Sequence, residues 1–396
     1  MLRPALILLL GSVGTANAAS EKVLYSFNPL IGDGYYPYAE QLLKVGGILY
    51  GSTEAGGANG YGTLFKVTKA GIEKVLYSFA NGNDGAAPRG GLIKVNGILY
   101  GTASEGGNPA GSTGCGGVGC GVAFKSTTAG NLSGLYSFKG DQDGGDPVGS
   151  LIDAGGTFYG TTFGDTTNGE NGTVFKLTKS GVETVLYSFG AINNDGANPH
   201  AKLINVGGIF YGTTVHGGGT GCELNSGCGT VFKVTLEGVE TVLHAFAGPN
   251  DAYPASGLIN VNGSFYGTTT GYGAGGGYGT VFKITPAGDY TVLYTFSGGK
   301  DGGSPGASLL NVGGTLYGTT YGGGSSNCNA GCGTVFKATK KGAETVVHTF
   351  TSGSDGAYPS SALIEVGSKL YGTTLKGGGS GCSESAGCGT IFEITP

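Results

Sequence analysis

Residues 199–246 read PHAKLINVGGIFYGTTVHGGGTGCELNSGCGTVFKVTLEGVETVLHAF. Two apolar segments, 203–206 and 209–214, flank a Gly-Gly pair, and two more, 229–235 and 240–246, follow a glycine-rich loop. Short runs of this kind, bounded by turn residues, are typical of strands. A Gly-Gly pair tolerates the positive φ angles of a two-residue hairpin turn. The stretch therefore predicts one sheet of four antiparallel strands.

The same pattern recurs seven times along the chain. A Tyr-Gly dipeptide in the second strand and a phenylalanine in the third mark each copy, and copies lie 50 to 59 residues apart. This spacing is near that of a propeller blade, about 40–50 residues, and no helical period follows residue 18. We expect an all-β, seven-bladed β-propeller with four antiparallel strands per blade. The markers are Tyr50, Tyr100, Tyr159, Tyr211, Tyr266, Tyr317 and Tyr371, with Phe65, Phe124, Phe175, Phe232, Phe282, Phe336 and Phe392.

The two ends of the repeat array complement each other. Residues 21–27 match the fourth strand of a copy, whereas residues 389–396 match the third. Pairing them closes the ring and satisfies two otherwise open strand edges. The N-terminal strand is therefore predicted to complete the last blade, and residues 19–396 to form one domain of seven repeats of about 50 residues.

Residues 1–18 have the features of an export signal. Arg3 precedes an apolar run at 5–10, and Ala16 and Ala18 form a small-x-small cleavage site. The alternative, a membrane anchor, needs a longer apolar run to span the bilayer. We expect cleavage near Ala19 and a secreted protein, with the periplasm or cell surface as alternatives and no membrane insertion. The chain stops at Pro396 on the last strand, which favours free secretion over anchoring by a tail.

Composition excludes several classes of function. The formal net charge is -5 and 12% of residues are charged, so nucleic acid and anionic membranes are not expected partners. The 86 glycines are interspersed with apolar runs that can bury a core, unlike in a disordered chain. No nucleophile elbow, zinc-binding helix or phosphate loop occurs. No catalytic residue is therefore assigned, and a monomer is expected.

The eight cysteines fall as four local pairs. Disulfides are expected for an exported protein, whereas zinc is the alternative. The varied spacings and the absence of accompanying histidines favour disulfides. The pairs are Cys115 with Cys120, Cys222 with Cys228, Cys328 with Cys332, and Cys382 with Cys388.

An aspartate followed three or four residues later by a proline also recurs in every copy. Seven such carboxylates are predicted to ring one mouth of the central channel. They offer a calcium site or polar sugar contacts, or they accept hydrogen bonds from their own turns. Recurrence in every copy favours the turn. The aspartates are Asp33, Asp84, Asp143, Asp195, Asp251, Asp301 and Asp355.

Further candidates lie in the connections on the rim opposite the hairpin turns, where loop length varies. Variable loops on a rigid scaffold commonly carry binding. Tyr35, Tyr36, Tyr253 and Tyr358 accompany the aspartates and suggest a recognition surface. Glu54, Glu105 and Asp165 follow the second strand of the first three copies. Carboxylates so placed suggest a general acid and base pair, and the alternative is that they are solvated loop acids. His200 and His216 near Asp195 suggest a metal cluster, and Arg89 is assigned to the surface.

The repeated unit, Leu-Tyr-Gly-Thr-Thr followed by a glycine-rich loop, Gly-Thr-Val-Phe-Lys-Val-Thr and Glu-Thr-Val-Leu-Tyr-Ser-Phe, resembles the GloVer tandem-repeat family of exported bacterial proteins. The resemblance covers essentially all of residues 19–396. It implies propeller-like repeats and an extracellular setting, and it supplies no activity or catalytic residues.

These features predict an extracellular binding or adhesion module that recognises protein or glycan at its loop-rich face. One alternative is an extracellular hydrolase or lyase with its site at the channel mouth. The other is a purely structural envelope protein. No cofactor is predicted, apart from the calcium alternative for the aspartates.

Overall fold

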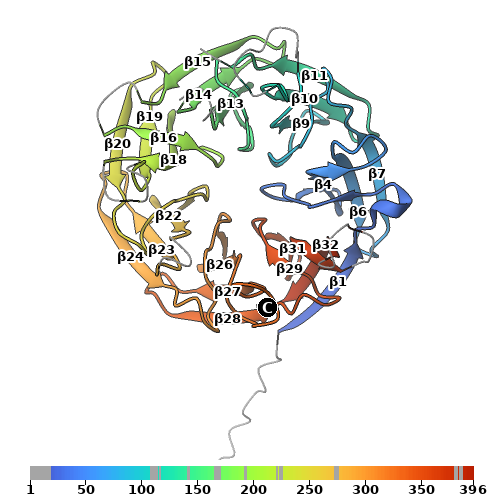
Figure 1. The fold of residues 1–396 in the computed structure, drawn as a ribbon. Coiled ribbons are helices and arrows are strands. Elements are labelled where there is room, and N and C mark those ends of the chain that lie inside the picture. The colour runs from blue at the N-terminus through green and yellow to red at the C-terminus, as the bar shows by residue number, and fades with distance from the viewer. Residues whose placement is uncertain are drawn as a thin grey trace, which may run out of the picture.

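Seven sheets, each built on four antiparallel strands and two of them extended by a fifth, surround a central axis (Figure 1). This computed structural model describes residues 19–107, 115, 117–140, 143–164, 171–190, 194–219, 222, 226–271, 276–378, 382 and 387–396. The sheets confirm the predicted all-β, seven-bladed propeller. Within the described ranges the one helical segment is a 3₁₀ turn, Pro29–Ile31, and no helix is long and apolar enough to cross a membrane.

The first three blades follow the chain in order, and each pairs its strands consecutively from the axis outward. Blade 1 contains β3 (Leu43–Val45), β4 (Ile48–Thr53), β6 (Thr63–Thr68) and β7 (Glu73–Ser78). Blade 2 contains β8 (Ile93–Val95), β9 (Ile98–Ala103), β10 (Val122–Thr127) and β11 (Leu132–Ser137). Blade 3 contains β12 (Ile152–Ala154), β13 (Thr157–Thr162), β14 (Thr173–Leu177) and β15 (Glu183–Ser188).

Blades 4 to 6 repeat this order, and blade 4 adds β16 (Gly196–Pro199) beside its second strand. Blade 4 contains β17 (Ile204–Val206), β18 (Ile209–Gly217), β19 (Thr230–Val234) and β20 (Glu240–Ala245). Blade 5 contains β21 (Ile259–Val261), β22 (Ser264–Thr269), β23 (Thr280–Ile284) and β24 (Tyr290–Thr295). Blade 6 contains β25 (Leu310–Val312), β26 (Thr315–Thr320), β27 (Thr334–Ala338) and β28 (Glu344–Thr349).

Blade 7 combines the two ends of the chain. It contains β30 (Ile364–Val366), β31 (Lys369–Gly378) and β32 (Gly387–Thr395), with β29 (Ala357–Pro359) beside β31 and β1 (Ser20–Ser26) outermost. Strand β1 pairs antiparallel with β32, and Val23 lies opposite Phe392. The predicted closure is confirmed. A separate two-stranded sheet joins β2 (Gly34–Tyr35) to β5 (Ala55–Gly56).

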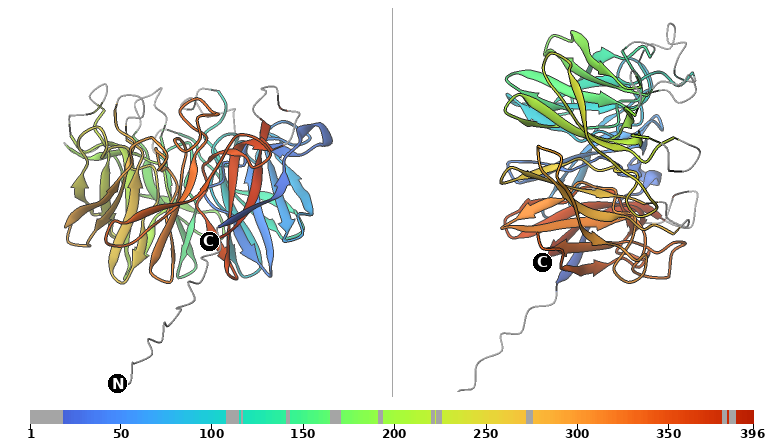
Figure 2. Two further views of the ribbon diagram at one scale, coloured as in Figure 1. Left: turned by 90° about the horizontal axis from the view of Figure 1, so that it is seen from below. Right: turned by 90° about the vertical axis from the view of Figure 1, so that its left-hand side faces the viewer.

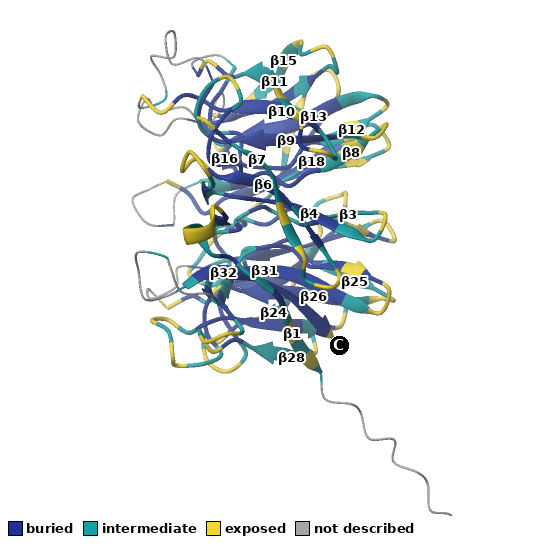
Figure 3. Ribbon diagram, turned by 90° about the vertical axis from the view of Figure 1, so that its right-hand side faces the viewer, coloured by how far each residue is buried: buried dark blue, intermediate teal, exposed yellow. Residues whose placement is uncertain are grey.

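The blades present two different rims, between which the strands run (Figure 2). One rim carries the tight turns, such as the one between the paired residues Val206 and Ile209, where Gly207 and Gly208 have φ angles of 63° and 87°. The other rim, called the loop rim below, carries the connections between blades and the loops between second and third strands. Figure 3 shows the middle strands buried and the turns exposed, as expected for sheets covered on both faces by neighbouring blades.

Phenylalanine pairs hold each blade to the next. The phenylalanine after each outer strand meets the third-strand phenylalanine of the following blade edge-on, with centroids 5.0 to 5.4 Å apart. The pairs are Phe27 with Phe65, Phe79 with Phe124, Phe138 with Phe175, Phe189 with Phe232, Phe246 with Phe282, Phe296 with Phe336, and Phe350 with Phe392.

The glycine of each Tyr-Gly dipeptide makes room for this ring. A Cβ atom at Gly212 would lie 2.6 Å from Phe232 Cζ and 2.8 Å from Leu203 Cδ2. The equivalent glycines in the other blades show the same crowding, with 2.5 to 2.7 Å to Cζ. The Tyr-Gly and Phe markers of the sequence are therefore two halves of one packing contact.

We expect Gly212→Ala to lower the free energy of unfolding by about 1–3 kcal/mol, because the added methyl overpacks a filled core. Urea unfolding followed by circular dichroism measures the change. Gly306→Ala is the control, since a Cβ there meets only Thr270 Cγ2, at 3.6 Å. Equal stability of the two variants would contradict this account of the repeat.

Candidate functional site

The residue before the recurring proline has a left-handed backbone in all seven blades. Its φ lies between 49° and 58° at Tyr36, Ala87, Asp146, Asn198, Tyr253, Ser304 and Tyr358. This conformation is uncommon outside glycine and persists only where the surroundings impose it. In blade 5 the N–H of Tyr253 donates to Cys228 O of the preceding blade at 2.8 Å, and Tyr253 O accepts from Thr270 N at 3.1 Å. The backbone is thus pinned between two blades.

The residue after each of these prolines lines a cavity of about 380 Å³ on the propeller axis, called the axial cavity below. All seven blades contribute one such residue: Tyr38, Arg89, Val148, His200, Ala255, Gly306 and Ser360. The volume is within the range of small-molecule sites, about 300–1,000 Å³. The proline recurs unchanged while its successor differs in every blade. A fixed frame thus presents seven different side chains to one space.

The axial cavity is asymmetric. Tyr38, Arg89 and His200 bring aromatic and charged groups from blades 1, 2 and 4, and Glu40 adds a carboxylate. Blades 5 to 7 contribute only small side chains after the proline, the largest being that of Ser360. At the positions after proline, blades 5 to 7 therefore leave more room than blades 1, 2 and 4, although Tyr321 of blade 6 also lines the cavity.

Arg89 is the centre of the polar wall that blades 1, 2 and 4 form. Its predicted place on the outer surface is therefore wrong. Its Nη2 donates to Glu54 Oε1 at 2.7 Å, and its guanidinium lies 5.9 Å from the Tyr38 ring centroid. Asp146 lies close enough to interact with this pair. Burial raises the pKa of Asp146 to about 6. The positive charge of Arg89 acts to lower this pKa, whereas the negative charges of Glu105 and Glu54 act to raise it.

The structure thus gives the two predicted glutamates different settings. Glu54 forms an ion pair with Arg89, whereas Glu105 lies near Asp146 and its backbone pairs with that of Ala86. They do not face each other across the axial cavity, since neither lines it. The third acid, Asp165, lies outside the described residues.

Glu40 bridges three blades at the base of the polar wall. Its Oε2 accepts from Ser150 N at 2.9 Å and from Ser150 Oγ at 2.6 Å, and its Oε1 accepts from Lys202 N at 3.4 Å. The next residue, Gln41, accepts at Oε1 from Lys202 Nζ at 3.2 Å. Because these bonds occupy the carboxylate, Glu40 positions the inner strands.

The histidines proposed as a metal cluster have separate partners. His200 lines the axial cavity, where burial lowers its pKa. His216 pairs its Nδ1 with Asn198 Oδ1 at 3.1 Å and meets the Tyr253 ring edge-on. Asp195 instead accepts from Tyr187. No group of three or more His, Cys, Asp or Glu able to hold a metal ion occurs among the residues that the structure describes.

The recurring aspartates lie against the outer strands, and the axial cavity is lined without them. In five blades the carboxylate accepts a hydrogen bond from the outer-strand tyrosine, as Asp195 does from Tyr187 at 2.7 Å. Backbone N–H groups of the same turn add further bonds, such as Gly190 N to Asp195 at 2.8 Å. These bonds match the predicted alternative in which each aspartate accepts hydrogen bonds from its own turn. The expected ring of carboxylates at the channel mouth is wrong, because an outer-strand tyrosine holds five of them at the periphery, and of the other two, Asp251 bonds to Tyr290 and Asp355 lies beside His348.

Two blades have histidine in place of that tyrosine. In blade 4 His244 stacks on Tyr290 of blade 5 at 3.8 Å, and Tyr290 donates its O–H to Asp251 at 2.5 Å. In blade 6 His348 Nε2 lies 3.7 Å from Asp355. Tyr290 of blade 5 therefore gives Asp251 the hydroxyl donor that His244 of blade 4 lacks.

At five junctions a glutamate that begins the next outer strand lies beside this aspartate. Burial raises the pKa of Glu73 to about 8 and those of Glu183, Glu240 and Glu344 to about 7, and the neighbouring aspartate adds to each rise. Glu21 beside Asp355 also has a raised pKa, chiefly through burial. These glutamates have carboxyl oxygens without a hydrogen-bond partner in the described part of the chain.

The four predicted tyrosines surround the axial cavity without lining it. Tyr36, Tyr253 and Tyr358 are the left-handed residues before proline, and Tyr35 meets Tyr36 edge-on at 4.9 Å. Tyr358 stacks on Tyr321, which does line the cavity, at 4.8 Å and 24°. From the sequence, Arg89 and His200 are assigned other roles, and Tyr321 and the other five residues after proline are missed. Their signal was variation at one position of an otherwise uniform repeat.

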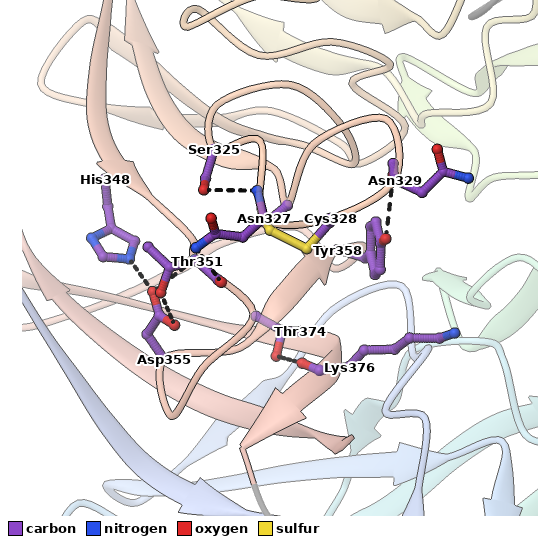
Figure 4. Close-up of a disulfide and its surroundings, with 11 residues drawn as sticks. Ser325, Asn327, Cys328, Asn329, His348, Thr351, Asp355, Tyr358, Thr374 and Lys376 are labelled. Atoms are coloured by element: carbon purple, nitrogen blue, oxygen red, sulfur yellow. Dashed lines mark hydrogen bonds and ion pairs between the residues drawn. A yellow bond between two sulfur atoms is a disulfide. The ribbon is translucent and has the colours of Figure 1, made fainter. Parts of the chain in front are cut away.

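Disulfides fix the glycine-rich loops of four blades. All four predicted pairs are joined, Cys115 to Cys120, Cys222 to Cys228, Cys328 to Cys332, and Cys382 to Cys388. Figure 4 shows Cys328 beside Asn329, whose carbonyl accepts from the Tyr358 hydroxyl at 3.3 Å. Four disulfides indicate an oxidising compartment, extracellular or periplasmic.

A family model for the Gloeobacter/Verrucomicrobia repeat matches residues 11–224 and 222–396. The chain belongs to this family. The GloVer resemblance inferred from the repeated unit is thereby confirmed. No curated protein matches the chain.

Solved propellers resemble the structure at low identity. PQQ-bound aldose sugar dehydrogenase from Streptomyces coelicolor is 14% identical over 95% of this chain and 98% of its own, with a TM-score of 0.46. A putative 6-phosphogluconolactonase from Bacteroides uniformis is 15% identical over 82% and 88%, with a TM-score of 0.47. Tricorn protease is 11% identical over 84% of this chain, which spans 27% of that protein, with a TM-score of 0.44. These likenesses bear on the fold alone.

The raised pKa of Glu240 predicts stability that depends on pH. A carboxyl with a folded-state pKa above its unfolded value stabilises the fold fully below about pH 4.5, and this contribution is lost as the pH rises through about 7. As the pH rises from about 5 to 8, the free energy of unfolding should therefore fall by roughly 1 kcal/mol less in Glu240→Gln than in the wild type. Urea unfolding across this range measures it. The exposed Glu237→Gln is the control, and parallel curves for wild type and both variants would contradict the assignment.

Proposed function

We propose that this family member is an exported binding module that takes its ligand into the axial cavity from the loop rim. The observation that carries the proposal is the set of seven residues after proline, different in every blade on one rigid frame. A structural envelope repeat has no need for seven different side chains around one space. Rigid scaffolds that display variable residues commonly bind ligands.

A glycan is the ligand class that the cavity favours. Tyr38, Phe163 and Tyr321 offer aromatic rings, and Ser308 and Ser360 offer hydroxyl groups that have no partner in the described part of the chain. Arg89 is already paired with Glu54. The Glu40 carboxylate accepts hydrogen bonds from Ser150 and from Lys202 N, so neither charge demands an ionic ligand. Aromatic faces combined with a few polar groups suit a hydroxylated sugar ring. The protein acts as a monomer outside the cytoplasm, where its four disulfides persist.

Filling the axial cavity tests this function. Gly306→Trp should abolish binding to a glycan array, because the indole occupies the space on the small-residue side, whereas Gly306→Ala should bind as wild type does. The backbone at Gly306 has room for a Cβ, so both variants should fold. The array is read with calcium and with a chelator. Signals unaffected by Gly306→Trp would place binding elsewhere, and no signal from wild type would overturn glycan recognition.

A hydrolase or lyase is the second candidate, and the observation in its favour is Asp146, which lies behind the lining, close enough to interact with the cavity residue Arg89. A carboxyl with a pKa of about 6 can donate or accept a proton near neutral pH. Asp146→Asn keeps the shape and suits the left-handed backbone at φ 56°. If bound glycans are cleaved, this variant should lose turnover by about 10²-fold or more while retaining binding. Product analysis by mass spectrometry decides this, and turnover equal to wild type would exclude Asp146 from the chemistry.

A further inference from the structure

A second hollow adjoins the axial cavity on the loop rim. This groove, of about 660 Å³, runs between loops of blades 5 and 6, and Ser304 and Tyr321 line both hollows. Seven glycines supply much of the remaining lining, together with Tyr278, Lys300 and Asn329. The two hollows therefore meet at Tyr321 and offer a path from the axis outward over the blades.

The junction at Tyr321 is held in place before any ligand arrives. Tyr321 stacks on Tyr358, whose hydroxyl donates to Asn329 O at 3.3 Å. The disulfide between Cys328 and Cys332 closes the same loop (Figure 4). Tyr321 nevertheless remains 43% exposed, which leaves ring surface for a ligand. A preorganised aromatic platform binds without an ordering cost.

The groove does not suit an extended peptide. Peptides that add to a sheet need unpaired backbone groups at an edge. Here Gly303 and Gly322 exchange two hydrogen bonds of 2.9 Å. Gly323 N donates to Ala330 O at 2.8 Å, and Gly324 N donates to Gly299 O at 2.7 Å. The N–H groups of these four glycines are thus already used.

Carbonyl oxygens with a spare lone pair remain, and they accept from hydroxyl groups. An aromatic face attracts the C–H edge of a sugar ring. The cavity's Arg89 is neutralised by Glu54, and its Glu40 carboxylate is occupied by hydrogen bonds from Ser150 and Lys202 N. Lys300 is then the charged side chain of the groove lining, and these features together favour an uncharged chain of sugars.

We infer that the site takes a linear neutral oligosaccharide. Its terminal sugar occupies the axial cavity, the next one lies on Tyr321, and later units follow the groove past Lys300 and Asn329. This inference rests on the proposed function and adds the length and polarity of the ligand.

Isothermal titration with cello-, malto- and N-acetylchito-oligosaccharides of one, two, four and six units tests it. In at least one series the hexasaccharide should bind about tenfold or more tightly than the monosaccharide. Removing both exposed groove side chains, K300A with N329A, should bring the hexasaccharide within about threefold of the monosaccharide and leave the monosaccharide unchanged. Tyr321→Ala should weaken binding of every length, and most strongly of two units and more, whereas Tyr321→Phe should retain binding because it keeps the ring.

The outcomes separate this inference from the proposed function. Binding that is sensitive to Gly306→Trp but equal for all chain lengths would overturn the groove and keep the axial cavity. Equal affinity of wild type and the K300A/N329A variant for the hexasaccharide would also overturn the groove. Failure of all three series, with array binding confined to charged glycans or proteins, would overturn the neutral oligosaccharide.

Discussion

The contact between a glycine and a phenylalanine ring holds the structure together. In each blade the second strand has a glycine at the point where the tip of the third-strand phenylalanine ring approaches it. That ring then meets the phenylalanine that ends the preceding blade's outer strand. Since every blade is bound to the next by the same pair, no blade buries its faces alone. This is the constraint that makes a closed ring the stable form.

Closure has a consequence for the site. Phe27 follows the N-terminal strand of blade 7 and packs on Phe65 of blade 1, so the first and last repeats are joined like any other pair. The seven residues before proline are then fixed at equal positions around one axis, each bonded to the loop of the blade before it. The strained backbone at these positions is maintained by the ring. Side chains after the proline are free to differ because the frame does not depend on them.

Repetition also explains why the uniform features of the sequence proved structural. Aspartates present in every copy bond to a tyrosine that is also nearly always present, and where His244 interrupts the pattern, Tyr290 of the next blade restores the hydroxyl. The glutamates beside them are likewise parts of the blade junctions. Asymmetry arises only at positions that the repeat leaves open, and these gather at the axial cavity and at the groove beside Tyr321.

The sequence by itself determined the strands, the number of blades, the closure by residues 20–26 and the cysteine pairs, because spacing and turn chemistry are local properties that the chain repeats seven times. It did not determine which residues face the axis. Arg89 and Glu54 are 35 positions apart, and Tyr321 of blade 6 stacks on Tyr358 of blade 7. Only the curvature of the closed ring brings such residues together. The tertiary structure therefore decided where the site is, since the direction of a side chain after proline depends on a backbone that neighbouring blades hold in place.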